Sequence, residues 1–197
     1  MADDFRPGFK TQCEEIAGEL RTELRLDQAA PLDCGQVAEH LAIPVSPITT
    51  LHAYGANREA INRLTNPQTG FSAVTVVSGT AMRVFYNPNQ PAGRQANSLA
   101  HELSHILLEH DPTPAVTTAG ERYWDGRQEG EADWLAGTIL VPRVAALAWM
   151  SRVGDLEGGA RHFGVSPALF RWRVNHTGVA RQLESLQRRS SRSRTFG

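Results

Sequence analysis

Cysteine, charge excess and long apolar runs are all scarce in this sequence of 197 residues. Its two cysteines, Cys13 and Cys34, lack the spacing of a metal site and are too few for a disulfide framework. No apolar run approaches the roughly 18 residues that a membrane-spanning helix requires. The acidic start MADDFRPGFK lacks the apolar stretch of a signal peptide. We therefore expect a cytoplasmic protein that has no disulfides and does not enter a membrane.

Strong net charge of either sign is missing too. The formal net charge is -1, so no overall basic field favours nucleic-acid binding. Basic side chains do gather at the very end of the chain, where Arg188, Arg189, Arg192 and Arg194 lie among serines. This polar composition predicts a disordered basic tail over 187–197.

The rest of the chain is predicted to form one α+β domain. Its hydrophobic share of 41% is sufficient for a single packed core over residues 1–186. The predicted parts are N-terminal helices at 7–42, a small sheet at about 43–87, two central helices within 94–142 and C-terminal helices at 143–186.

Local patterns set this order. The helical spacing of Ile16, Leu20 and Leu24 predicts a first helix, and Asp33 is a candidate N-cap for a short helix after it. Two β-rich runs on either side of Ser78-Gly79-Thr80 predict a hairpin whose second arm is MRVFY. Between these parts, the segment AYGANREAINRLTNPQTG is ambiguous.

The two central helices carry the most informative residues. QPAGRQANSLAHELSHILLEH predicts a helix from about Arg94 to Glu109, and QEGEADWLAGTIL predicts a second that stops near Val141-Pro142. Beyond it, the composition predicts two or three short helices joined at glycines.

Three ionisable residues, His101, Glu102 and His105, lie in the otherwise apolar segment AHELSHILLEH. Unpaired charge in such a segment is costly, so these side chains need a partner. Histidines four residues apart project from one face of a helix and can bind one ion, while Glu102 can reach a water on that ion. This HExxH pattern predicts a zinc site with Glu102 as general base. The alternative is a polar helix face packed under a loop.

A third protein ligand is available downstream. Glu129 would complete a His2Glu site with the fourth position open for water, and Asp133 would accept the remaining N–H of a ligand histidine, His101. Glu131 is the rival third ligand, although it lies on a different helical face and leaves Asp133 unexplained. His110 is a weaker rival, which we expect at the surface at the helix end.

Two blocks of sequence carry a family likeness: R-x-x-x-x-L-A-H-E-L-S-H from Arg94 to His105, and E-G-E-A-D-W-L-A-G-T-I-L-V-P from Glu129 to Pro142. With these blocks, the chain resembles the ImmA/IrrE family of zinc metallopeptidases. Weaker likenesses in PLDCGQVAEHLAIPV and ARHFGVSPALFRWRVNHTG extend the match over nearly the entire chain. Ser104, where the family usually has glycine, is a mild departure.

The resemblance implies a zincin-like α+β fold, in which a small mixed sheet packs on the helices that carry HExxH and the downstream glutamate. It implies Zn2+ as the cofactor and a cytoplasmic regulatory protein as the substrate. The family's typical targets are helix-turn-helix transcriptional repressors, cleaved after a stress signal. An edge strand such as MRVFY is expected to hold an extended peptide beside the metal.

Two other functions remain as alternatives: a zinc-containing regulator without proteolytic activity, and a DNA-binding stress or transcription factor. The second depends on FGVSPALFRWRVNHTG forming a helix-turn-helix with Arg171 and Arg173 exposed, and the near-neutral charge argues against it. Oxyanion stabilisation needs a further donor. The candidates are Tyr123, Arg143, His162 and Arg171.

Overall fold

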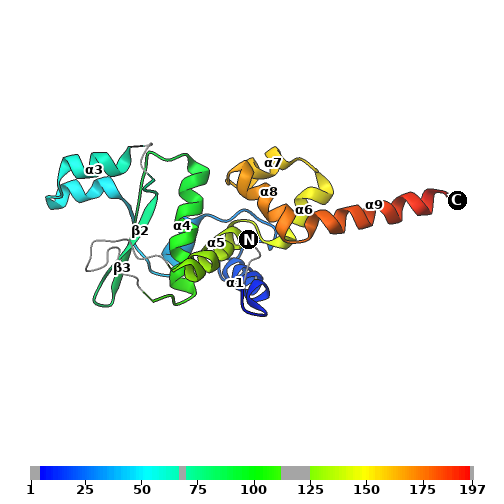
Figure 1. The fold of residues 1–197 in the computed structure, drawn as a ribbon, viewed down its shortest axis with the longest axis horizontal. Coiled ribbons are helices and arrows are strands. Elements are labelled where there is room, and N and C mark those ends of the chain that lie inside the picture. Colours follow the sequence, from blue (N-terminus) through cyan, green and yellow to red (C-terminus); the bar gives the residue numbers. More distant parts are fainter. Residues whose placement is uncertain (1–4, 67–69, 112–124, 196–197) are drawn as a thin grey trace.

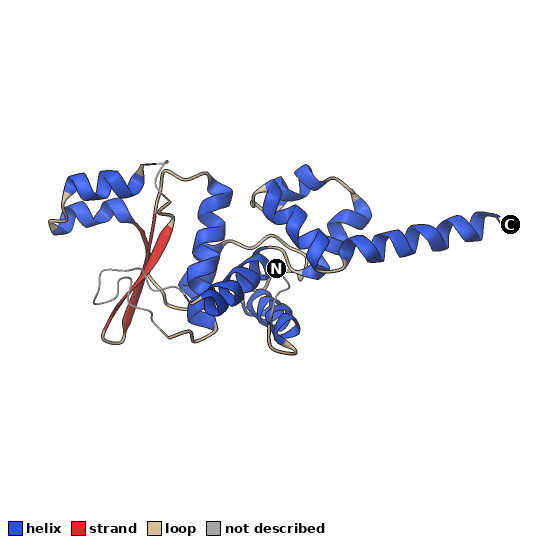
Figure 2. Ribbon diagram, in the orientation of Figure 1, coloured by secondary structure: helices blue, strands red, loops and turns tan. Residues whose placement is uncertain are grey.

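A three-stranded sheet and a larger set of helices make up this computed structural model, which describes residues 5–66, 70–111 and 125–195. The strands gather toward one end of the molecule, and the last helix extends from the other (Figures 1 and 2). The predicted α+β class is confirmed.

The elements are α1 (Phe9–Glu23), α2 (Cys34–His40), β1 (Val45–Pro47), the 3-10 helix η1 (Ile48–Tyr54), α3 (Arg58–Thr65), β2 (Ala73–Ser78), β3 (Ala81–Tyr86), α4 (Ala92–Leu107), α5 (Gly126–Leu140), α6 (Arg143–Arg152), α7 (Leu156–His162), α8 (Pro167–His176) and α9 (Val179–Thr195).

The predicted hairpin is confirmed in β2 and β3. Ser78 pairs with Ala81, so the turn has two central residues, and its Gly79 adopts a φ of 61°, which costs glycine nothing sterically. β1 runs parallel to β3 on the other side, which gives the strand order β1-β3-β2.

The expectation that MRVFY forms an edge strand is therefore wrong. β3 lies in the centre of the sheet, and β2 is the edge strand on the hairpin side. Sequence patterns did not reveal this because β1 has three residues, one of them Pro47, and pairs with a strand far along the chain. A run that short shows no alternation.

α4 packs between the sheet and α5, and α1 packs on α5 (Figure 1). Leu103 of α4 and Leu135 and Ile139 of α5 are fully buried in the main hydrophobic core. The second half of α5, residues 134–140, is buried around its whole circumference, as expected of a helix covered on several sides. This packing fixes the axial position of α4 relative to α5.

Caps define the shorter helices as the local sequence suggests. Asp33 accepts a hydrogen bond from the Gly35 backbone N–H at 2.7 Å, so its predicted role as N-cap of α2 is confirmed. The ambiguous segment forms α3, where the Asn57 side chain accepts from Ala60 N–H at 3.0 Å.

The C-terminal part consists of short helices joined at glycines, as predicted. Gly154, Gly164 and Gly178 follow α6, α7 and α8 with φ values of 75°, 64° and 75°. These left-handed conformations end each helix and favour glycine.

α9 continues to Thr195, so the structure describes a helix over most of the segment for which the composition predicts a disordered tail. Arginine, glutamine and leucine are good helix formers, and α9 contains neither glycine nor proline. An ion pair between Glu184 and Arg188, at 3.1 Å and one turn apart, supports it further.

Arg173 corrects a second expectation. It is fully buried in α8, where its Nη2 donates to Glu14 Oε1 at 2.6 Å and its Nε donates to the Val141 carbonyl at 2.8 Å. The DNA-binding alternative required Arg171 and Arg173 to be exposed together. Arg173 is instead a structural link between α8 and α1.

Among the residues that the structure describes, no single helix is long and apolar enough to cross a membrane. α5 and α6, bent by 47° at the break between them, pass that test as a pair by length and composition alone.

Candidate metal centre

The HExxH residues lie on α4, which begins after Pro91. His101 and His105 are one turn apart, and their Nε2 atoms face each other at 3.1 Å. Below them, Ala100 and Leu103 anchor the helix in the core. The buried Ser104 hydroxyl donates to the Ala100 carbonyl at 2.7 Å. Its hydrogen-bonding requirement is therefore met within α4, and no side chain from another element is needed.

α5 brings Glu129 to the same point. Its Oε2 lies 3.4 Å from His101 Nε2, and its Oε1 lies 3.7 Å from His105 Nε2. One ligand atom from each of the three residues lies within 4.8 Å of the others. A tetrahedral zinc ion with bonds of about 2.0–2.1 Å holds its ligand atoms roughly 3.3 Å apart. Two imidazoles and a carboxylate at these separations therefore fit zinc in both donor chemistry and spacing.

Asp133 lies behind His101, one turn beyond Glu129 on α5. Its Oδ1 is 2.8 Å from His101 Nδ1, so Nδ1–H donates to the carboxylate and Nε2 keeps its lone pair for a metal. Burial lowers the pKa of His101, but the hydrogen bond and charge of Asp133, with Glu102 and Glu129, outweigh it and raise the pKa above its ordinary value.

His105 titrates in the opposite direction. Burial and the neighbouring His101 and His110 lower its pKa to about 4, against the weaker pull of Asp133. At neutral pH this imidazole is uncharged, which is the form that binds a metal.

Glu102 has its partner in the sheet. Its Oε2 accepts a hydrogen bond of 2.6 Å from the Thr75 hydroxyl in β2, the edge strand. Glu102 therefore lies between the group formed by His101, His105 and Glu129 and the strand. Thr75 was missed by sequence reasoning, since nothing local to a threonine in a β-rich run relates it to a residue on α4.

The expectation that His110 lies at the surface is wrong, and Glu131 lies beside it. His110 is not at the surface, because its side chain is 7% exposed and its Nδ1 lies 2.9 Å from His105 Nδ1. Glu131, the rival third ligand, lies 3.3 Å from His110 Nε2 and is not part of the cluster formed by the other three residues. The structure thus brings Glu129, and not Glu131, beside His101 and His105.

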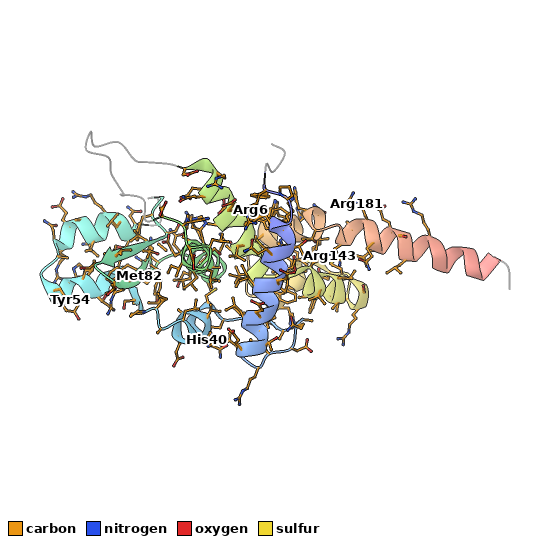
Figure 3. The ribbon with its side chains drawn as sticks, turned by 90° about the horizontal axis from the view of Figure 1, so that it is seen from below. Arg6, His40, Tyr54, Met82, Arg143 and Arg181 are labelled. Carbon is orange, nitrogen blue, oxygen red and sulfur yellow. The ribbon has the colours of Figure 1, made fainter. Side chains whose placement is uncertain are left out.

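The candidate oxyanion donors make their contacts elsewhere. Arg143 binds the Thr177 carbonyl at 3.1 Å, and Figure 3 places it among the C-terminal helices, away from the hairpin that carries Met82. His162 stacks on Trp149, and Arg171 pairs with Glu157 at 3.8 Å. Tyr123 lies outside the described residues.

Fold and site together are those of an α+β protein with a metallopeptidase-type HExxH helix and a downstream glutamate. The sequence profile of the IrrE N-terminal-like domain, a metallopeptidase family, matches residues 54–175. This match covers more than half of the chain and includes both helices of the site. The chain belongs to this family.

Other comparisons are more distant. A solved structure described as a Mycobacterium tuberculosis transcriptional regulator aligns with a TM-score of 0.45 and 14% sequence identity. The alignment covers 85% of this chain and 47% of that one, so the present chain spans about half its length. A comparison with curated proteins found no match.

Proposed function

We propose that this chain is a zinc-dependent endopeptidase in which His101, His105 and Glu129 hold the metal and Glu102 is the general base. The observation that carries the proposal is the convergence of two Nε2 atoms and one carboxylate, 3.1 to 3.7 Å apart, on a single point. Asp133 orients His101 from outside the ligand set.

When bound at this site, zinc lowers the pKa of a coordinated water to about 7 and polarises the scissile carbonyl. In the reaction, Glu102 would be the residue that accepts a proton from the attacking water and donates it to the amine that leaves. Because Thr75 occupies Oε2, we assign Oε1 to the proton transfer. His101 and His105 keep their Nε2 atoms unprotonated throughout.

The substrate we propose is an extended segment of a regulatory protein, with a helix-turn-helix repressor as the first candidate. β2 is an edge strand beside α4, and an extended peptide can add to such an edge by backbone hydrogen bonding. Val76 and Val77 of β2 are 46% and 41% exposed and offer apolar contacts to its side chains.

We further propose that residues 1–186 act as one metallopeptidase domain. One hydrophobic cluster contains Phe9 of α1, Leu103 of α4, Leu135 of α5 and Val179 at the start of α9. A shared core of this kind supports a single folding unit.

Metal analysis beside a cleavage assay tests the function. Purified wild type should bind one zinc ion per chain, whereas His105→Ala and Glu129→Ala should lose it. Glu102→Gln should retain the metal but no longer cleave a peptide library prepared from the cell's own proteins. Stoichiometric zinc in the wild type, His105→Ala and Glu129→Ala alike would refute the ligand assignment. Cleavage by Glu102→Gln would refute the base. A biological effect that survives Glu102→Gln would indicate a regulator that acts by binding.

A further inference from the structure

The end of α4 folds a histidine back onto the proposed metal site. The backbone N–H of Glu109 donates to the Ile106 carbonyl at 3.1 Å, and that of His110 donates to the His105 carbonyl at 3.0 Å. Glu109 has a φ of 52°. This is the Schellman arrangement, in which the residue after the left-handed one packs over the residue five positions before it. The helix end therefore holds the His110 side chain against His105.

The contacts made by His110 continue inward to a carboxylate. Its ring centroid lies 5.0 Å from that of His105, with Nδ1 to Nδ1 at 2.9 Å, and its Nε2 lies 3.3 Å from Glu131 Oε2. The side chains of His110 and Glu131 are 7% and 8% exposed. A buried carboxylate needs hydrogen-bond donors, and His110 is the nearest that the structure describes, with Arg127 Nη1 at 3.8 Å.

The proton positions in this series of hydrogen bonds follow from the carboxylate at its buried end, Glu131. An ionised carboxylate only accepts hydrogen bonds, so Glu131 requires N–H at His110 Nε2. With its ring proton on Nε2, His110 has a bare Nδ1, which can only accept. The bond to His105 must therefore be donated by His105 Nδ1–H. That leaves the lone pair of His105 on Nε2, the atom that faces His101 and Glu129.

We propose that His110 and Glu131 form a positioning relay that fixes the tautomer and orientation of His105 for metal binding. The inference rests on the metal site proposed above. It gives His105 the support that Asp133 gives His101, but from inside the protein: the Asp133 side chain is 71% exposed, while both members of the relay are buried. Neither His110 nor Glu131 touches the metal in this arrangement.

Zinc affinity of two substitutions at His110 tests the relay. His110→Phe keeps the ring but removes the acceptor, and should weaken zinc binding about 10- to 100-fold, the usual effect of losing such a partner. His110→Asn places an amide oxygen near the position of Nδ1 and should restore affinity to within about threefold of wild type. His40→Phe is the matched control, because it removes a histidine paired with a carboxylate, Glu23 at 2.8 Å, outside the site. Dissociation constants are measured by competition with a chromophoric chelator.

Each outcome decides a separate point. Wild-type affinity in His110→Phe would overturn the relay, and so would equal losses in His110→Phe and His110→Asn, which would make His110 itself a ligand. Failure of the wild type to bind zinc would refute the proposed function. If His110→Phe does not fold, nitrogen-15 NMR of wild-type histidines still decides: the relay requires a protonated Nδ1 at His105 with and without zinc, and a bare Nδ1 would overturn it.

Discussion

At the scale of single residues, Glu102 differs from its neighbours on α4 in that its hydrogen-bond partner comes from the sheet and not from a helix. His101 and His105 are paired with side chains from α5 and from the end of α4, whereas Glu102 accepts from Thr75 in the sheet. The strand that we propose to hold the peptide thus also orients the base. In the proposed mechanism, one hydroxyl would couple peptide binding to proton transfer.

Thr75→Val should slow cleavage without loss of metal. Valine keeps the β-branched shape and removes the hydroxyl, and a hydrogen bond to a charged group contributes about 1.5–3 kcal/mol. We expect kcat to fall by about tenfold or more, since about 1.4 kcal/mol corresponds to tenfold in rate. Zinc content should be unchanged. Thr75→Ser retains the hydroxyl and is the control, and equal rates for the two variants would contradict the coupling.

Zinc binding should release one proton, and not two, from about pH 5 up to the pKa of His101. The pKa of His105 is lowered to about 4, so this imidazole is already neutral throughout that range. The pKa of His101 is raised, so its proton competes with the metal. Affinity should therefore increase with pH about tenfold per unit below the pKa of His101, and level off above it. Chelator competition across a pH series measures the slope, and a hundredfold change per unit would contradict it.

At the scale of elements, the end of α4 departs from the usual pattern. A Schellman helix end commonly has glycine at the left-handed position, but this chain has Glu109 there, with a φ of 52°. A side chain in that conformation costs roughly 1–2 kcal/mol. The cost is local, while the benefit lies in placing His110 over His105.

Glu109→Gly should stabilise the metal-free protein by about 0.5–1 kcal/mol. Relief of the left-handed strain exceeds the entropy that glycine adds to the unfolded chain, which is about 0.4–1 kcal/mol. Urea unfolding in the presence of a chelator measures the free energy difference. Glu109→Ala keeps a Cβ and should show no comparable gain. A destabilised glycine variant would mean that the Glu109 side chain makes a contact of greater value than the strain.

Helical elements and the residues on them were predictable because their spacing is local. His101, Glu102 and His105 share one helix, and Glu129 and Asp133 share another, so a period of 3.6 residues fixed their relative faces. Thr75 and the position of β3 depend on strand pairing between distant segments. The position of the His110 side chain depends on the left-handed conformation of Glu109, which a glutamate gives no reason to expect. The sequence therefore did not predict features that depend on pairing between distant segments or on an unusual backbone conformation.

At the scale of the whole molecule, the C-terminal helices are joined to the rest of the protein from two sides. Arg173 of α8 reaches Glu14 of α1, and burial lowers its pKa while Glu14 opposes that shift. On the other side, Gly93 in the first turn of α4 lies against the backbone of Val165 and Ser166, between α7 and α8. The helix that carries the proposed ligands is therefore in direct contact with the C-terminal part.

Gly93→Ala should destabilise the protein by up to about 2 kcal/mol. An added Cβ would lie 2.9 Å from the Val165 carbonyl carbon and 3.0 Å from Ser166 N, and backbone atoms cannot move aside cheaply. Overpacking of this kind costs about 1–3 kcal/mol, more than the roughly 1 kcal/mol that alanine gains over glycine in a helix. Gly130→Ala is the matched control, since its Cβ would meet Phe5 at an ordinary 3.7 Å and should stabilise. Urea unfolding with chelator present compares them; if both variants gain stability, α4 is not held against the turn between α7 and α8.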